Sequence, residues 1–186
     1  MAAGKSHVAG PRIAWALSPF DEQNLRPLRA IRQDESDMYK FFEDEKFLEA
    51  RRNKQYYFWS RILLNTPSWD DVLKDLEKSI EENSLIKIGQ YFSIITHRGD
   101  RHIQLAADFL NEVKKLDVSL PGSAHVYTGL TKHSQGLGRH NDDADVFFWQ
   151  IIGSTNWKIF TQSGMREHAL NVGDVIYIPR KMDHEV

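Results

Sequence analysis

The spacing of apolar residues changes near the middle of the chain, and this change restricts the fold. Between residues 34 and 116 the spacing is largely helical. After Leu120-Pro121-Gly122 the helical period disappears, and short β-prone runs alternate with Gly, Asn and Ser turns. Helices followed by several strands predict an α+β fold with a C-terminal barrel or sandwich.

Two helices and a set of strands can be assigned from the spacing. Thr66-Pro67 is expected to begin a helix, because Thr can cap a helix and Pro fits its first position. The apolar positions 69, 72, 73, 76 and 80 would form one helical face, and positions 103, 106, 109 (or 110) and 113 a second. Strands are expected at 85–95 (one or two), 124–130, 145–152, 156–160 and 174–178, with a hairpin turn at 153–156.

The amino-acid composition excludes several kinds of binding and catalytic site. The 186 residues include 24 Lys and Arg against 26 Asp and Glu, a net charge of −2, so nucleic-acid binding is not indicated. There is no cysteine, which excludes disulfides, thiol nucleophiles, Fe–S clusters and thiolate zinc sites. Any metal must therefore be held by carboxylates and by the eight histidines.

The gross organisation indicates one domain over residues 1–186. The N-terminal stretch lacks the continuous apolar core of a secretory signal. No run approaches the roughly 20 apolar residues that a membrane-spanning helix needs. We therefore expect a cytoplasmic protein without a membrane partner; the oligomeric state is left open.

A short polar motif carries the chemical signal. His140 and Asp142 follow the Gly-rich turn 136–138, and two such residues at the end of a strand can point toward the same ion. His184, 44 residues after His140, follows the last expected strand and would supply a third ligand. Two imidazoles and one carboxylate leave three metal positions open, the arrangement of non-haem Fe(II) oxygenases. Taken alone, His-x-Asp is a weak signal, because a short polar triplet after a Gly-rich turn is by default a surface loop.

The order of the surrounding blocks makes the motif more specific. It is followed by Asp145-Val146-Phe147-Phe148-Trp149-Gln150-Ile151-Ile152-Gly153, then Trp157-Lys158-Ile159-Phe160, then Gly173-Asp174-Val175-Ile176-Tyr177-Ile178-Pro179, then His184-Glu185. This series resembles the JmjC-type cupin oxygenases, especially their ribosomal-oxygenase-like branch. The resemblance covers residues 136–185, about a quarter of the chain.

The resemblance implies a double-stranded β-helix, a cupin or jelly-roll barrel. Residues 121–186 would form this core, and residues 1–120 a mostly helical lead-in packed on the substrate side. Fe(II) would be held by His140, Asp142 and His184, with 2-oxoglutarate and O₂ as co-substrates. The implied reaction hydroxylates a C–H bond of a protein side chain or a small amino-acid-like molecule, and yields succinate and CO₂.

The sequence departs from the family pattern at two places. Members typically carry a Lys or Arg two residues before the Trp of the second strand, to pair with the distal carboxylate of 2-oxoglutarate; here the residue is Thr155. Tyr127 and Lys158 are further candidates for co-substrate contact, although Lys158 should face away from Trp157. The core also ends soon after His184, so we expect it to lack its last strand. The positive charge that Thr155 lacks could instead come from Arg139, Arg166 or Arg180.

Two other functions stay open. A cupin enzyme could use the same metal without 2-oxoglutarate, because Thr155 lacks the usual charge. A non-catalytic barrel could instead bind a ligand or partner. His125 and His133 are alternative metal ligands, although core or loop positions suit them better.

Overall fold

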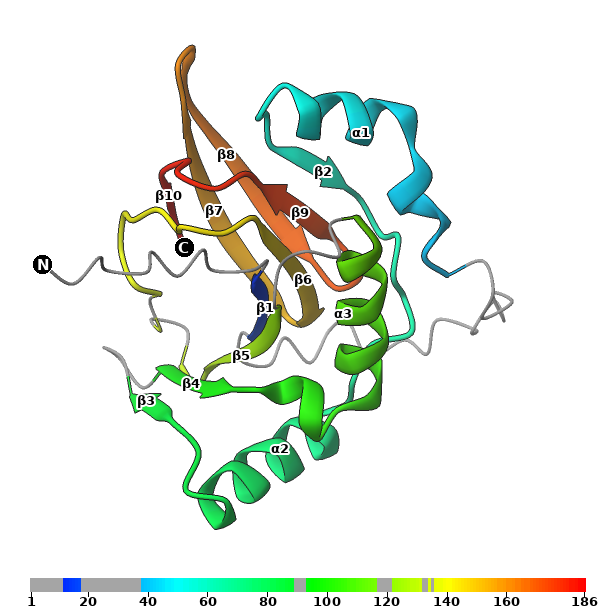
Figure 1. Ribbon diagram of the computed structural model, residues 1–186. Coiled ribbons are helices and arrows are strands. Elements are labelled where there is room, and N and C mark those ends of the chain that lie inside the picture. The colour runs from blue at the N-terminus through cyan, green and yellow to red at the C-terminus, as the bar shows by residue number, and fades with distance from the viewer. Residues whose placement is uncertain (1–11, 18–37, 89–92, 117–121, 132–133, 135) are drawn as a thin grey trace, which may run out of the picture.

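The structure is a computed structural model that describes residues 12–17, 38–88, 93–116, 122–131, 134 and 136–186. Its strands form two sheets, and its helices lie mostly outside them (Figure 1). The helices are α1 (Glu45–Arg52), α2 (Trp69–Glu81) and α3 (Gln104–Leu116), with 3-10 turns at Lys40–Glu43 and Gly99–Arg101. The strands are β1 (Arg12–Leu17), β2 (Tyr57–Trp59), β3 (Ile86–Ile88), β4 (Ser93–His97), β5 (Ser123–Gly129), β6 (Val146–Ile152), β7 (Ser154–Thr161), β8 (Gly164–Asn171), β9 (Val175–Ile178) and β10 (His184–Glu185).

The larger sheet contains seven strands in the order β2-β9-β6-β1-β5-β4-β3. Its central strand, β1, pairs in parallel with both β5 and β6, whereas the other neighbours pair antiparallel. The smaller sheet has the order β10-β7-β8 and is antiparallel throughout. The chain thus combines helices with two sheets, as the change in apolar spacing indicates.

Strand β6 separates two hydrophobic cores because its side chains alternate between the faces of the sheet. Phe147, Trp149 and Ile151 pack with the aromatic residues of α1, β2 and α3. Val146 and Phe148 face the other way and pack against residues of β7, β8 and β9. The second core therefore lies between the two sheets, directly beneath the ends of the strands that carry the site.

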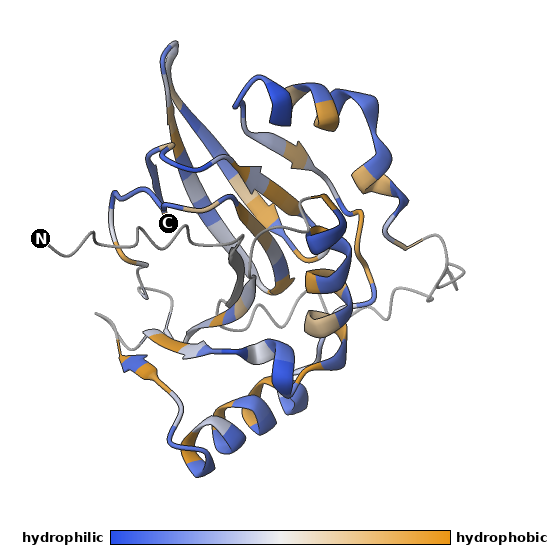
Figure 2. Ribbon diagram, in the orientation of Figure 1, coloured by the Kyte–Doolittle hydropathy of each residue, from blue (hydrophilic) through white to orange (hydrophobic). Residues whose placement is uncertain are grey.

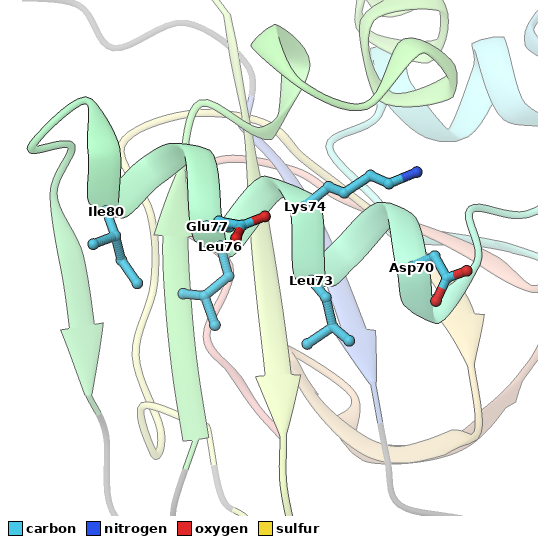
Figure 3. A pocket seen from close by; sticks show the side chains of 6 residues that line it. All are labelled: Asp70, Leu73, Lys74, Leu76, Glu77 and Ile80. Carbon is cyan, nitrogen blue, oxygen red and sulfur yellow. The ribbon is translucent and has the colours of Figure 1, made fainter.

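Helix α2 differs from its expected form. It begins at Trp69 rather than at Thr66-Pro67, because Ser68 and Asp71 form a reciprocal capping box. Its buried side chains are Val72, Asp75 and Ser79, whereas Leu73 and Ile80 are exposed; Figure 2 shows apolar and polar residues interleaved along the helix, and Figure 3 shows the side chains of Leu73 and Ile80 on one side of it. The predicted apolar face of this helix is therefore only partly buried, since the carboxylate of Asp75 occupies an inward position.

Most expected strands are present with shifts of one or two residues at their ends. The predicted hairpin at 153–156 is wrong, because Gly153 connects β6 in the larger sheet with β7 in the smaller one. The hairpin instead joins β7 to β8, a strand that was not predicted because most of its residues are polar.

The N-terminal part also differs from a mostly helical lead-in, since β1 to β4 all join the larger sheet. Residues 1–11 and 18–37 of that part lie outside the described residues.

Among the described residues, no helix combines the length and the apolar character needed to span a bilayer.

Candidate metal centre

The fold brings His140, Asp142 and His184 together, with one ligand atom of each within 4.8 Å of the others. Asp142 Oδ2 lies 3.8 Å from His140 Nε2 and 3.6 Å from His184 Nε2. Two donors bound to one ion by bonds of about 2.1 Å can lie up to about 4.2 Å apart. The separations of the carboxylate from both imidazoles therefore fit a shared ion.

Backbone hydrogen bonds hold the two ligand segments side by side. The His140 amide donates to the His184 carbonyl at 2.9 Å, and the His184 amide donates back to the His140 carbonyl at 2.8 Å. The Lys181 amide donates to the Asp142 carbonyl at 2.8 Å. Residues far apart in the sequence thus form one short antiparallel bridge, and the ligand side chains project from it.

Both imidazoles are oriented by carbonyl groups two residues earlier in the chain. Nδ1 of His140 lies 2.7 Å from the Gly138 carbonyl, and Nδ1 of His184 lies 3.0 Å from the Met182 carbonyl. An Nδ1–H that donates to a carbonyl leaves the lone pair on Nε2, the atom that faces Asp142. The φ of Gly138 is +72°, a left-handed conformation that favours glycine and that presents its carbonyl to His140.

The site is buried on one side and open on the other. His184 is 2 % exposed, while the side chains of His140 and Asp142 are partly exposed. Burial, together with the charge of His140, lowers the pKa of His184. A lowered pKa keeps this imidazole neutral, which is its metal-binding form.

A polar cluster on the opposite face of the bridge was missed by sequence reasoning. Asp183 Oδ2 accepts hydrogen bonds from Nε and Nη2 of Arg139, at 3.1 and 2.9 Å, and Oδ1 accepts from Asn141 Nδ2 at 2.8 Å. The Arg139 guanidinium also lies 3.9 Å over the ring of Phe160. The hydrogen bonds from Asn141 and Arg139 lower the pKa of Asp183. The sequence could have indicated this cluster, because side chains alternate along an extended segment. The residues on either side of each candidate ligand therefore share the face opposite to it.

Thr155 and Tyr127 face the core between the sheets. Thr155 shares a face of β7 with Trp157 and Ile159, and Tyr127 packs against the same core. The Thr155 hydroxyl donates to Gln150 Oε1 at 2.7 Å and accepts from Trp157 Nε1 at 3.1 Å. The Trp157 ring in turn stacks on His184, with centroids 5.7 Å apart. The Trp157 ring therefore connects His184, by stacking, with the hydrogen-bonded pair Thr155 and Gln150.

The remaining candidates lie elsewhere. Lys158 is on the other face of β7, with its Nζ 3.3 Å from Glu185. His125 packs beside His97 with ring centroids 4.3 Å apart, and neither belongs to the ligand group. His133 lies outside the described residues. Arg166 is opposite Ile159, and Ile159 is opposite His184, so the three residues share one row and one face of the smaller sheet.

Comparisons with known proteins agree with this geometry. Residues 102–168, which include His140 and Asp142, match the family model of the JmjC domain. No curated protein sequence matches the chain. Among solved structures, YcfD, a ribosomal oxygenase from Escherichia coli, in complex with cobalt and 2-oxoglutarate, is similar with a TM-score of 0.61 at 18 % identity. Its complex with cobalt and succinic acid gives a TM-score of 0.59, also at 18 % identity.

Both alignments cover 75 % of this chain and 46 % of YcfD, so the chain spans less than half the length of that relative. Residues 102–168 therefore match the JmjC domain, and the fold of the chain is similar to that of YcfD.

Proposed function

We propose that this chain is an Fe(II)- and 2-oxoglutarate-dependent oxygenase built on a double-stranded β-helix core. The observation that carries the proposal is the orientation of His140 and His184, whose Nδ1 atoms are held by carbonyls so that both Nε2 atoms face Asp142. This donor set, two neutral imidazoles and one carboxylate, is the one that non-haem Fe(II) oxygenases use.

When bound, Fe(II), 2-oxoglutarate and O₂ supply an oxidative decarboxylation that converts a substrate C–H to C–OH and releases succinate and CO₂. The chain's own residues fix where this happens. The bridge between His140 and His184 sets the ligand positions, and the buried side of His184 excludes water from one flank. The partly exposed side, at His140 and Asp142, is where a substrate would enter.

The substrate is proposed to be a side chain of a protein. The likeness to a ribosomal oxygenase supports this class, and the open flank of the site leaves room for a polypeptide. A small amino-acid-like molecule is the other substrate that the same open positions would accept. Peptide-library turnover followed by mass spectrometry distinguishes the two, since only a protein substrate gains about 16 Da on a residue within a peptide.

The distal carboxylate of 2-oxoglutarate needs polar partners in the core between the sheets. Thr155 and Tyr127 face that core, and Arg166 shares the row of His184 on the same side. We assign Tyr127 as a hydrogen-bonding partner, Thr155 as a second one once its hydroxyl turns from Gln150 to the carboxylate, and Arg166 as the source of positive charge. Lys158 is not assigned this role, because it contacts Glu185 on the other face.

One observation favours a second function. The Thr155 hydroxyl is already engaged by Gln150 and Trp157, which suits a cupin enzyme that binds metal but uses no 2-oxoglutarate. Isothermal titration of 2-oxoglutarate into the anaerobic Fe(II) form separates the two functions. Saturable one-to-one binding supports the first, and no binding supports the second.

Succinate release from 2-oxoglutarate tests the proposed reaction. We expect Fe(II)-dependent succinate formation by the wild-type chain and a loss of at least about a hundredfold in His140→Ala, because two ligands alone bind iron poorly. Glu185→Gln is the matched control: Glu185 follows His184 in the sequence, its carboxylate pairs with Lys158 at 3.3 Å, and the variant should retain activity. Full activity in His140→Ala would refute the assignment.

A further inference from the structure

The indole ring of Trp157 lies against the imidazole of His184, one of the three candidate ligands. The two ring centroids are 5.7 Å apart and the ring planes are inclined by 27°, an offset stack within the range that aromatic pairs favour. Trp157 is 3 % exposed and His184 is 2 % exposed, so the stack is shielded from solvent. Ile159 on β7 lies opposite His184 on β10, and Trp157 shares its face of β7 two residues earlier, so the strand register places the two rings together.

The stack restrains a motion that the hydrogen bond of the imidazole leaves free. Nδ1 of His184 lies 3.0 Å from the Met182 carbonyl, and this bond holds one edge of the ring. A single hydrogen bond still allows the ring to tilt about the line that joins its donor and acceptor. An aromatic ring stacked on the imidazole opposes that tilt, and so keeps Nε2, 3.6 Å from Asp142 Oδ2, directed toward the candidate metal position.

A chain of hydrogen bonds sets the orientation of the Trp157 ring. Gln150 is completely buried, and its Nε2 donates to the Ile152 carbonyl at 2.7 Å, which leaves Oε1 to accept a bond from Thr155. The Thr155 hydroxyl donates to this Oε1 at 2.7 Å, while its oxygen accepts from Trp157 Nε1 at 3.1 Å. Indole has a single N–H donor, so this bond selects one orientation among those that apolar packing alone would allow. The Thr155 oxygen can keep this role when its hydrogen turns to another acceptor.

We propose that Trp157 is a positioning residue that holds the plane of the His184 imidazole, and that Thr155 and Gln150 set the orientation of the Trp157 ring. Residues behind a metal ligand change metal affinity because they fix the direction of the donor atom. The inference rests on the proposed metal centre and adds to it residues of β6 and β7 that hold no metal themselves. If these residues only packed the core, their removal would change stability and leave the metal site unaltered.

Cobalt(II) titration without 2-oxoglutarate tests the inference, with the visible absorption of bound cobalt as the readout. Thr155→Val is close in shape but lacks the oxygen that accepts from Trp157 Nε1. It should weaken cobalt binding about threefold to tenfold and change the spectrum, whereas Thr155→Ser restores the hydroxyl and should retain wild-type affinity. Trp157→Leu removes the stacked ring and should weaken binding about tenfold or more, and Trp157→Phe, which keeps a ring, should recover most of that loss.

Trp149→Phe is the matched control. Trp149 is a fully buried residue of β6 whose Nε1 donates to the Leu63 carbonyl at 3.3 Å in the other core. This variant loses a comparable bond and should keep the cobalt affinity and spectrum of the wild type, while urea denaturation measures the stability of every variant.

The Thr155 pair decides the question even if Trp157→Leu does not fold. An unchanged affinity and spectrum in Thr155→Val, or an equal loss in Trp149→Phe, would overturn the positioning role and leave the metal centre intact. A wild-type chain that binds no cobalt would overturn both the metal centre and the inference that rests on it.

Discussion

Asp183 links the two segments that carry the candidate ligands. Its carboxylate receives hydrogen bonds from Arg139 and Asn141, which flank His140, while Asp183 itself precedes His184. Residues behind a metal site commonly change metal affinity by about 10- to 100-fold when they are removed. We therefore predict that Asp183→Ala lowers cobalt(II) affinity about tenfold, measured by isothermal titration.

Two further variants distinguish the role of Asp183 in orienting the candidate ligands from the effect of its charge. Asp183→Asn keeps one oxygen acceptor and should recover part of the affinity. Glu185→Gln flanks His184 on the other side and should leave the affinity unchanged. Equal losses in Asp183→Ala and Glu185→Gln would show that Asp183 has no special role in orienting the ligands.

His168 gives a prediction about pH. Burial lowers its pKa below the ordinary value of 6.5; the imidazole lies 3.2 Å from the Tyr56 hydroxyl, beside Phe58 and opposite Trp157 on β7. As the pH falls through 6.5, the unfolded chain therefore binds a proton more readily than the folded chain. The free energy of unfolding should fall in that window, and level off below the lowered pKa of the folded state.

Urea denaturation between about pH 7.5 and about pH 5 measures this effect. His168→Gln keeps a polar group near Tyr56 but does not titrate, so its unfolding free energy should decline less steeply with acidification. The contribution of His168 is disproved if the two proteins show the same slope.

Single residues also show what a sequence can and cannot predict. The proximity of His140, Asp142 and His184 could be predicted because the order of the surrounding blocks is specific. The orientation of the imidazoles could not, because it depends on the carbonyls of Gly138 and Met182, which the fold brings into place.

At the scale of elements, α2 is anchored by a buried polar network rather than by apolar packing. Asp75 connects the helix to Thr96 on β4 and to His102, which also lies 3.3 Å from Glu82. Removing the carboxylate leaves two buried groups without their partner. We predict that Asp75→Ala lowers the free energy of unfolding by about 3 kcal/mol in urea denaturation.

The control for this variant lies on the same helix. Glu81 pairs with Lys78 at 2.8 Å, but both side chains are more than half exposed. Glu81→Ala should therefore change the free energy of unfolding by less than about 0.5 kcal/mol. A comparable loss in both variants would mean that helix propensity, and not the buried network, explains the effect.

The same network explains why the apolar spacing of α2 does not match the face of the helix that is buried. The spacing of Leu73, Leu76 and Ile80 is typical of a helix face that packs inward. Periodicity cannot show that Asp75 meets Thr96 and His102, because those residues are distant in the sequence. The buried residues of helix α3 are all apolar, and its predicted face, with Phe109 and Val113, is buried as expected.

At the scale of the whole molecule, the order of the strands was the least predictable feature. Strands β5, β6, β7 and β9 were expected from their composition, but their division between two sheets was not. The central place of β1, parallel to β5 and β6, depends on long-range pairing that leaves no local signal. The two-core arrangement follows from this topology, since β6 must be covered on both faces.

The fold brings the two short segments that carry His140 and His184 together, and cobalt(II) binding measures directly whether they share one metal ion. Titration of cobalt(II) into the metal-free chain, followed by its visible absorption, should saturate at one equivalent. Subsequent addition of 2-oxoglutarate should change the absorption, because the co-substrate would enter the open positions. His184→Ala should remove both signals. Absence of stoichiometric cobalt binding by the wild type, or an unchanged spectrum in His184→Ala, would contradict the assignment of His140, Asp142 and His184 to one metal.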